Sequence, residues 1–302
     1  MIRFESVSKT YTTLVTRRRV DALVDFSMEM RRGEVIGIAG PNGAGKSTLI
    51  SLLMGFLNPT GGRITIDGVT PRAYVERHGV SYLTELVNLP PRWKVTTTLT
   101  RMAVLSGVAP GEVGALVHTS QAELGLDEHA AKTVKQLSKG NLQRLGLAQA
   151  LLGDFDIVVL DEPTHGLDPL WTQRFRDVVA QLRRPDRLML IASHNLDELE
   201  RLADRVAILN KGQLQRVVEH GSGAAMAAPI VWRVAFEGSA DVRAMLPGAT
   251  AVDGRPGVWR VSATRTQLSA ALVTLLTNGN VLIECSPEQS SLEAAFRAAV
   301  QE

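Results

Sequence analysis

A glycine-rich segment near the N-terminus has the residue types and the spacing of a phosphate-binding loop. Residues 40–48 read GPNGAGKST and fit the pattern G-x-x-x-x-G-K-[ST]. Glycines allow successive backbone N–H groups to turn towards one anion, and a helix that begins at Lys46 adds the positive end of its dipole. The residues that we expect to bind nucleotide phosphates are Asn42, Gly43, Ala44, Gly45, Lys46, Ser47 and Thr48.

Two carboxylates follow the apolar run 157–160 and complement this loop. We expect Asp161 to hold Mg²⁺, directly or through water, together with the hydroxyl of Ser47. We expect Glu162 to orient and deprotonate a water molecule aimed at the γ-phosphate, while Lys46 reaches the outer phosphates. These residues predict a site that binds and cleaves a nucleoside triphosphate.

Two further positions carry weaker signals of the same chemistry. Ser138 can cap the helix that follows it, and the N–H groups around Gly140 would form a second anion site. His194 directly follows the apolar run 188–192, at a strand end where α/β folds place their ligands. The other five histidines have no spacing typical of metal ligands.

Short apolar strands that alternate with helices must position these residues. Residues 34–39 form a buried strand that leads into the loop, and residues 49–57 are apolar with helical spacing. The run 156–160, apolar from Ile157 on, and the fully apolar run 188–192 are typical of strands at the centre of a parallel sheet. Further strands are expected at 2–6, 23–30, 63–68 and 79–83. We therefore expect an α/β fold whose core is a mixed, mostly parallel sheet.

Start signals mark the helices of this core. Asp168 places an N-cap acceptor before Pro169 at the first helical position, and Asn195 with Glu198 resembles a capping box. From about 91 to 136 the chain has patches of helical periodicity and no long apolar strand, which predicts a small helical insert.

The C-terminal part reads as a second, smaller domain. Residues 221–229 are small and are expected to be a linker. Beyond them we expect strands at 230–236, 249–252, 257–262 and 280–284, with helices at 241–246, 265–277 and 291–300. The order β-α-β-β-α-β matches the ferredoxin-like α+β motif.

Composition narrows the class of protein. The 302 residues allow two domains, and 45% hydrophobic with 21% charged residues describes an ordinary globular protein. A net charge of +2 gives no reason to expect nucleic acid as a partner. The single cysteine, Cys285, suits a reducing compartment, and the chain has neither a signal-peptide pattern nor an apolar run long enough to cross a bilayer. We expect a cytoplasmic protein that relies on another chain for any membrane-spanning helices.

Taken in order, these motifs resemble those of the ATP-binding subunit of an ABC transporter, over about residues 1–218. The Walker A motif is 40–48, the signature is 137–141, and Walker B is 157–162. A D-loop at 166–168 and the switch histidine His194 follow. The resemblance implies a P-loop NTPase cassette at 1–220 with a helical subdomain at about 88–152, before the linker 221–229 and an accessory domain at 230–302.

The resemblance also implies functions for single residues. Glu162, His194 and Lys46 would be catalytic towards ATP and Mg²⁺, and Tyr11 would stack on adenine. In the family two cassettes meet head to tail, and the signature of one closes on the nucleotide held by the other. The residues implied in this second contact are Ser138, Gly140, Asn141 and, from the D-loop, Asp168.

Two departures from the family pattern stand out. Glu85 occupies the position where the family normally has a glutamine. Two carboxylates about 4 Å apart repel by several kcal/mol at an effective dielectric near 20, so we expect Glu85 to be a metal or water ligand. The signature reads LSKGN in place of LSGGQ, so Lys139 adds a cation near the partner's phosphates and Asn141 is a shorter amide.

Glu85, the Lys-Gly signature and the ending 291–296 resemble ATPases of ABC-2-type exporters. The implied partners are a separate integral membrane permease, which segment 86–94 would contact, and a second copy of the ATPase. The chain would then work at the cytoplasmic face of the membrane.

Two other readings stay open. Similar cassettes serve copper-site maturation of nitrous-oxide reductase, which the run 143–152 would also suit. The other alternative is a soluble regulatory ABC ATPase that uses the C-terminal domain as a sensor.

Overall fold

A computed structural model describes residues 1–12, 19–219, 230–238, 243, 248–252, 257–288 and 291–301. These residues divide into two compact units, Met1–Val217 and Val218–Glu302. The expected linker 221–229 and nearly all of the expected helix 241–246 lie outside the described residues.

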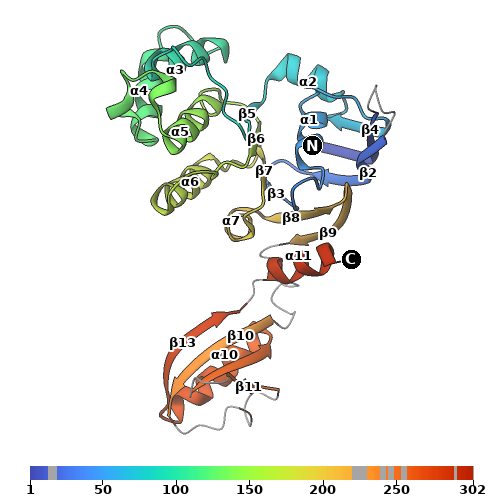
Figure 1. Cartoon of the computed structure of the whole chain (residues 1–302), viewed down its shortest axis with the longest axis vertical. Coiled ribbons are helices and arrows are strands. Elements are labelled where there is room, and N and C mark those ends of the chain that lie inside the picture. The colour runs from blue at the N-terminus through green and yellow to red at the C-terminus, as the bar shows by residue number, and fades with distance from the viewer. Residues whose placement is uncertain are drawn as a thin grey trace. The chain divides into compact units, whose positions relative to one another are not determined.

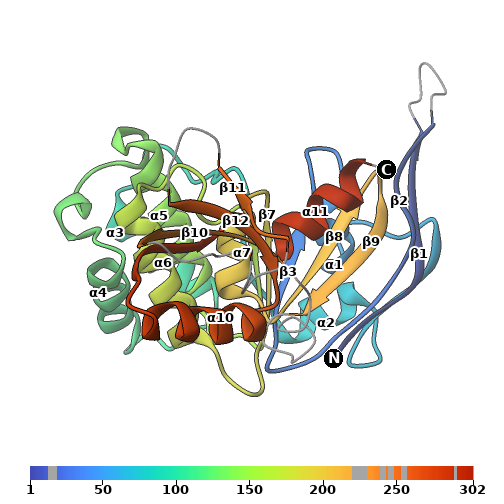
Figure 2. The ribbon, with the colours of Figure 1, turned by 90° about the horizontal axis from the view of Figure 1, so that it is seen from below.

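The first unit contains two sheets with a helix between them (Figure 1). A three-stranded antiparallel sheet has the order β2-β1-β4, and a six-stranded sheet has the order β5-β6-β7-β3-β8-β9. Figure 2 shows β3, β8 and β9 side by side. The strands are β1 (Ile2–Thr12), β2 (Arg19–Met30), β3 (Val35–Ala39), β4 (Gly61–Ile66), β5 (Ser81–Leu83), β6 (Ile157–Asp161), β7 (Leu188–Ser193), β8 (Arg205–Asn210) and β9 (Gln213–Glu219).

Five neighbouring strands of the larger sheet, from β5 to β8, run parallel. Its central strands β3, β6 and β7 are buried along their whole length, as expected for fully apolar runs covered on both faces. One hydrophobic core joins the two sheets through Leu49, Ile50 and Leu53 of helix α1 (Lys46–Leu53). The mostly parallel α/β core is thereby confirmed.

Helices connect the strands and form the expected insert. In Figure 1, α3, α4 and α5 group together at one end of the first unit. Residues 88–138 also hold two short 3₁₀ turns, η1 (Asp127–His129) and η2 (Val134–Gln136). The helices of the unit are α1, α2 (Pro71–His78), α3 (Val95–Leu105), α4 (Val113–Glu123), α5 (Lys139–Ala150), α6 (Pro169–Leu182) and α7 (Leu196–Leu202).

Three element predictions were wrong in detail. The helix expected to reach residue 57 ends at Leu53, because Gly55 is left-handed (φ +70°) and the amides of Phe56 and Leu57 bond back to Ser51 O. The strands expected at 2–6 and 23–30 are longer, because register shifts along β1 break the alternation on which the prediction relied. Asn195 does cap α7, but the Glu198 carboxylate pairs with Arg176 and does not complete a capping box.

The second unit is built around a four-stranded antiparallel sheet of order β11-β12-β10-β13. The strands are β10 (Ile230–Glu237), β11 (Thr250–Ala251), β12 (Val258–Ala263) and β13 (Val281–Pro287), and the helices are α10 (Arg265–Thr277) and α11 (Ser291–Gln301). Figure 2 shows α10 lying along this sheet, where Leu268 and Leu275 pack on Trp232, Val234 and Val261. The strand–strand–helix–strand succession after β10 agrees with the expected α+β order.

Candidate functional site

The parallel register brings four strand ends to one edge of the sheet. Ala39 at the end of β3 pairs with Ser193 of β7, and Asp161 at the end of β6 pairs with Ala192. Leu83, the last residue of β5, pairs with Leu160. Ligands of open α/β sheets bind outside the carboxyl ends of the strands. The glycine-rich loop, Glu85, Glu162 and His194 all follow these ends.

The glycine-rich loop wraps around its own lysine. Gly43 and Gly45 have left-handed backbones (φ +81° and +106°), and a β-carbon at Gly45 would lie only 2.5 Å from Ala22 O. Helix α1 begins directly after this turn, at Lys46. The buried Lys46 ammonium donates to Gly40 O (2.7 Å) and, more weakly, to Pro41 O (3.4 Å). The loop therefore surrounds a cation at the N-terminus of a helix, which is a favourable setting for an anion.

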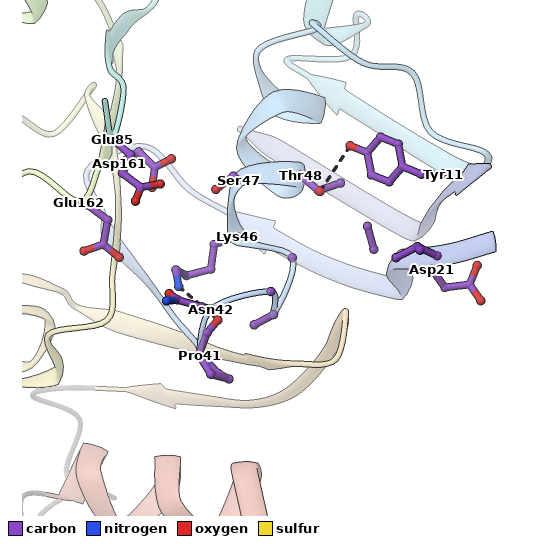
Figure 3. Close-up of a pocket in the computed structure, with 15 residues that line it drawn as sticks. Tyr11, Asp21, Pro41, Asn42, Lys46, Ser47, Thr48, Glu85, Asp161 and Glu162 are labelled. Carbon is purple, nitrogen blue, oxygen red and sulfur yellow. Dashed lines mark hydrogen bonds between the residues drawn. The ribbon is translucent and has the colours of Figure 1, made fainter. Parts of the chain in front are cut away.

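A pocket of about 490 Å³ lies over the loop, a volume typical of small-ligand sites (Figure 3). In the close-up, Glu85, Asp161 and Glu162 line one side, Lys46 and Ser47 lie opposite them, and Tyr11 and Asp21 lie at the far side. The Tyr11 hydroxyl is 3.5 Å from Thr48 Oγ1. Lining residues that the sequence analysis had singled out are Tyr11, Asn42, Gly43, Ala44, Gly45, Lys46, Ser47, Thr48, Glu85, Asp161 and Glu162.

Sequence reasoning missed one wall of this pocket. Val20, Asp21 and Ala22, at the start of β2, also line it. They carry no motif, and they reach the pocket only because β2 passes close to Gly45 in the folded chain.

The carboxylates on one side of the pocket repel one another. Burial, and then the charges of Glu85 and Glu162, raise the pKa of Asp161 to about 6, although Lys46 opposes the shift. Carboxylates placed together favour a cation, and oxygen ligands suit Mg²⁺. The described residues contain no cluster of three or more His, Cys, Asp or Glu that could hold a metal alone. Ser47, Glu85 and Asp161 have the oxygen donors that Mg²⁺ prefers, so they would fit this ion if phosphate and water oxygens supplied further ligands.

Glu162 is fixed by contacts from the neighbouring strand end. Its own backbone is left-handed (φ +49°), an uncommon conformation for a residue with a side chain. Glu162 is only 6% exposed. Its carboxylate accepts hydrogen bonds from the backbone N–H of His194 (3.0 Å) and from the hydroxyl of Ser193 (3.2 Å). His194 Nδ1 lies 2.8 Å from Glu162 Oε2. The structure therefore brings His194 to Glu162, although His194 does not line the pocket.

The signature and D-loop residues are not brought to this pocket. Ser138 caps α5 by accepting from the backbone N–H of Asn141 (3.3 Å), and Asp168 caps α6 by accepting from that of Trp171 (2.9 Å). A β-carbon at Gly140 would lie 3.0 Å from Gly166 O, so the start of α5 packs closely on the loop after β6. Ser138, Gly140, Asn141 and Asp168 thus belong to a second surface of the same unit.

Comparisons with known proteins match this chain to ABC transporter proteins. The family model described as ABC transporter matches residues 23–165. An ABC transporter ATP-binding protein of Synechocystis is 35% identical over 211 residues, which cover 69% of this chain and 60% of that protein. The chain thus spans less than two thirds of that relative's length. The methionine import ATP-binding protein MetN of Caulobacter vibrioides is 32% identical over 313 residues, covering 93% of each protein.

Solved structures agree at the level of the fold. The dimeric structure of MJ0796, a bacterial ABC transporter cassette, matches with a TM-score of 0.66 and 23% sequence identity. The matched region covers 72% of this chain and 98% of the MJ0796 chain. The chain has a P-loop and strand-end carboxylates, and the MetN protein of Caulobacter vibrioides matches it at 32% identity over 93% of each protein. The chain therefore belongs to the family of ABC transporter ATP-binding cassettes, which are ATPases.

Proposed function

We propose that this chain binds ATP with Mg²⁺ in the pocket over residues 40–48 and hydrolyses it to drive a membrane permease. The observation that supports this most is the convergence of the loop, Asp161 and Glu162 on one pocket at the carboxyl edge of the sheet. The phosphates would meet the loop N–H groups and Lys46, and Tyr11 would stack on the adenine. Ser47, Glu85 and Asp161 would hold Mg²⁺, which supplies charge neutralisation at the phosphates when bound.

Glu162 is the proposed base for the attacking water. Its carboxylate is already oriented by Ser193 and by the backbone of His194, so little reorganisation is needed before proton transfer. The exposed His194 ring, in contact with Glu162, would face the γ-phosphate side of the closed site. We assign Glu162, His194 and Lys46 as the catalytic residues.

Hydrolysis is proposed to occur between two copies of the chain. Ser138, Gly140, Asn141 and Asp168 lie away from their own pocket, which suits residues that meet the nucleotide of a second copy. ATP would then hold two cassettes together and its cleavage would release them. A second cassette of different sequence that carries the same motifs could also complete the site.

A separate permease is the proposed recipient of this work. No helix within the described residues is long and apolar enough to span a membrane. Leu86 is 77% exposed in the segment 86–94, and Phe56 beside Tyr82 is 63% exposed, which together offer apolar surface close to Glu85. We propose that this surface meets the permease, and that the chain acts at the cytoplasmic face of the membrane through it.

The direction of transport is proposed to be export. Glu85 in the glutamine position and the Lys-Gly signature support this assignment through their resemblance to ABC-2-type ATPases. Import is the second candidate, because the alignment with the methionine import protein MetN extends through the second unit. Residues 230–302 are proposed to be an accessory domain that adjusts the pairing of cassettes.

The substitution Glu162→Gln tests the proposal. It should lower the ATPase rate by roughly 100-fold or more, which is the range of one general base, while ATP affinity stays within a few-fold. Co-purification of the tagged chain should recover a permease, and sealed vesicles containing the complex should then show the direction of ATP-driven transport. An unchanged ATPase rate in the Glu162→Gln chain would refute the proposed catalytic site. Transport in the import direction would favour import over export.

A further inference from the structure

The two residues by which the signature departs from the family pattern are each held by a histidine. Lys139 Nζ lies 2.7 Å from His165 Nε2, and Asn141 Nδ2 lies 2.7 Å from His129 Nε2. His165 comes from the loop after β6, and His129 comes from η1. We propose that His129 and His165 are positioning residues that fix the signature for the nucleotide of a second copy. This inference rests on the proposed function.

The hydrogen-bond donors and acceptors around Asn141 allow only one orientation of its side-chain amide. Arg144, which can only donate, bonds to Asn141 Oδ1, so the amide NH₂ must face His129. His129 Nε2 therefore accepts, and the ring proton sits on Nδ1. That Nδ1 is buried and has no hydrogen-bond partner within the described ranges. The contact with Asn141 is thus the hydrogen bond that orients this ring.

Arg144 is itself rigidly held, so Asn141 is clamped from both sides. Its guanidinium donates to Leu124 O and Gly125 O, both at 3.1 Å, and lies 3.9 Å from the Trp171 ring centroid. A β-carbon at Gly125 would lie 2.4 Å from the Trp171 ring and 2.9 Å from Arg144 Nη1, so only glycine allows this close approach. The shorter amide of Asn141 is therefore presented in one fixed orientation.

His165 holds Lys139 without neutralising it. A lysine ammonium only donates, so the His165 ring accepts this hydrogen bond at Nε2 and brings no negative charge to it. The Lys139 stem lies across Gly166, 3.1–3.2 Å from where a β-carbon would be. None of the ion pairs found among the described residues involves Lys139. A carboxylate in place of His165 would hold the ammonium equally well but would cancel its charge towards a phosphate.

The test uses the full-length chain carrying Glu162→Gln, in which ATP-driven pairs should accumulate. Sedimentation in Mg-ATP gives the dissociation constant of the pair, and ATP binding to the single chain is measured separately at low protein concentration. His129→Leu and His165→Leu should each weaken pairing roughly 25-fold, about 5-fold for each of two symmetric contacts, with ATP affinity of the single chain unchanged. His118→Leu, at an exposed position of α4, is the matched control and should pair normally.

Two conservative variants separate positioning from mere packing. His129→Gln retains a side-chain acceptor and should recover most of the pairing. His165→Asn should also recover it, whereas His165→Asp should pair as poorly as His165→Leu because it neutralises Lys139. Equal pairing of His165→Asp and His165→Asn would overturn the assignment for Lys139.

The experiment separates failure of the positioning role of His129 and His165 from failure of the proposed function. If the Glu162→Gln chain does not pair in Mg-ATP, the proposed function is wrong and the inference falls with it. If that chain pairs and both leucine variants pair equally well, only the inference is overturned.

Discussion

Asp161 keeps its carboxylate in a setting that disfavours its charge. Its pKa of about 6 in the folded chain lies above the ordinary value of 3.8, so the folded state binds the proton more tightly. Without Mg²⁺, the free energy of unfolding should therefore fall as pH rises from about 4 to about 6, and the loss should be complete above that window. Asp161→Asn should raise the unfolding free energy at pH 8 by about 3 kcal/mol in chelator.

Denaturant titrations at pH 4 and pH 8 measure this difference. The advantage of Asp161→Asn should shrink at pH 4, where the native carboxyl is protonated. Mg-ATP should reverse the order at pH 8, because the proposed metal ligand Asp161 then gains a bound cation that the neutral asparagine holds more weakly. An Asp161→Asn chain with an unchanged pH profile would contradict the assigned cause.

Glu85 lines the pocket together with Asp161 and acts on that carboxylate by charge repulsion. If Glu85 is a metal ligand as proposed, removing its charge should weaken Mg²⁺ binding, because a neutral amide oxygen attracts the cation less than a carboxylate oxygen. We expect Glu85→Gln to raise the Mg²⁺ concentration for half-maximal ATPase activity by roughly 10-fold. The exposed Glu112→Gln is the control, and identical Mg²⁺ curves for all three proteins would remove Glu85 from the metal site.

At the scale of elements, α6 and α7 are joined by one buried charge pair. Glu198 is 3% exposed and bonds to Arg176 through both carboxylate oxygens. A buried carboxylate that loses its partner is strongly destabilising, although Arg176 is itself partly exposed. Arg176→Met should lower the unfolding free energy by about 3 kcal/mol.

Thermal and chemical unfolding check this expectation. Arg174→Met, two residues earlier on α6, should change stability by no more than about 0.5 kcal/mol. The double variant Arg176→Met/Glu198→Gln should recover part of the loss, because no unpaired charge then remains. A single variant as stable as the native chain would show that water reaches Glu198.

At the scale of the whole molecule, the two units have separate cores. The residues of the large core and all residues lining the pocket lie before residue 218. A chain that ends at Glu219, the last residue of β9, should therefore fold and bind ATP within about threefold of the full chain. Circular dichroism and calorimetric ATP titration measure both properties, and loss of ATP binding in a folded product would show dependence on residues 220–302.

Local chemistry in the sequence determined much of this protein. Residues 40–48, the apolar strands and the caps at Ser138 and Asp168 were recognisable because each depends on neighbours within a few positions along the chain. Fully apolar runs also fixed the class of sheet, since only strands covered on both faces need them. These features require no knowledge of distant contacts.

Only the tertiary structure decided which distant groups meet. The wall at Val20–Ala22, the contact of His194 with Glu162, and the histidines that hold Lys139 and Asn141 join segments more than 10 residues apart. The early end of α1 and the pairing of Glu198 with Arg176 were also set by packing between elements. Hydrogen bonds and charges act over a few ångströms in space, so their partners are fixed by how the strands and helices pack and not by order along the chain.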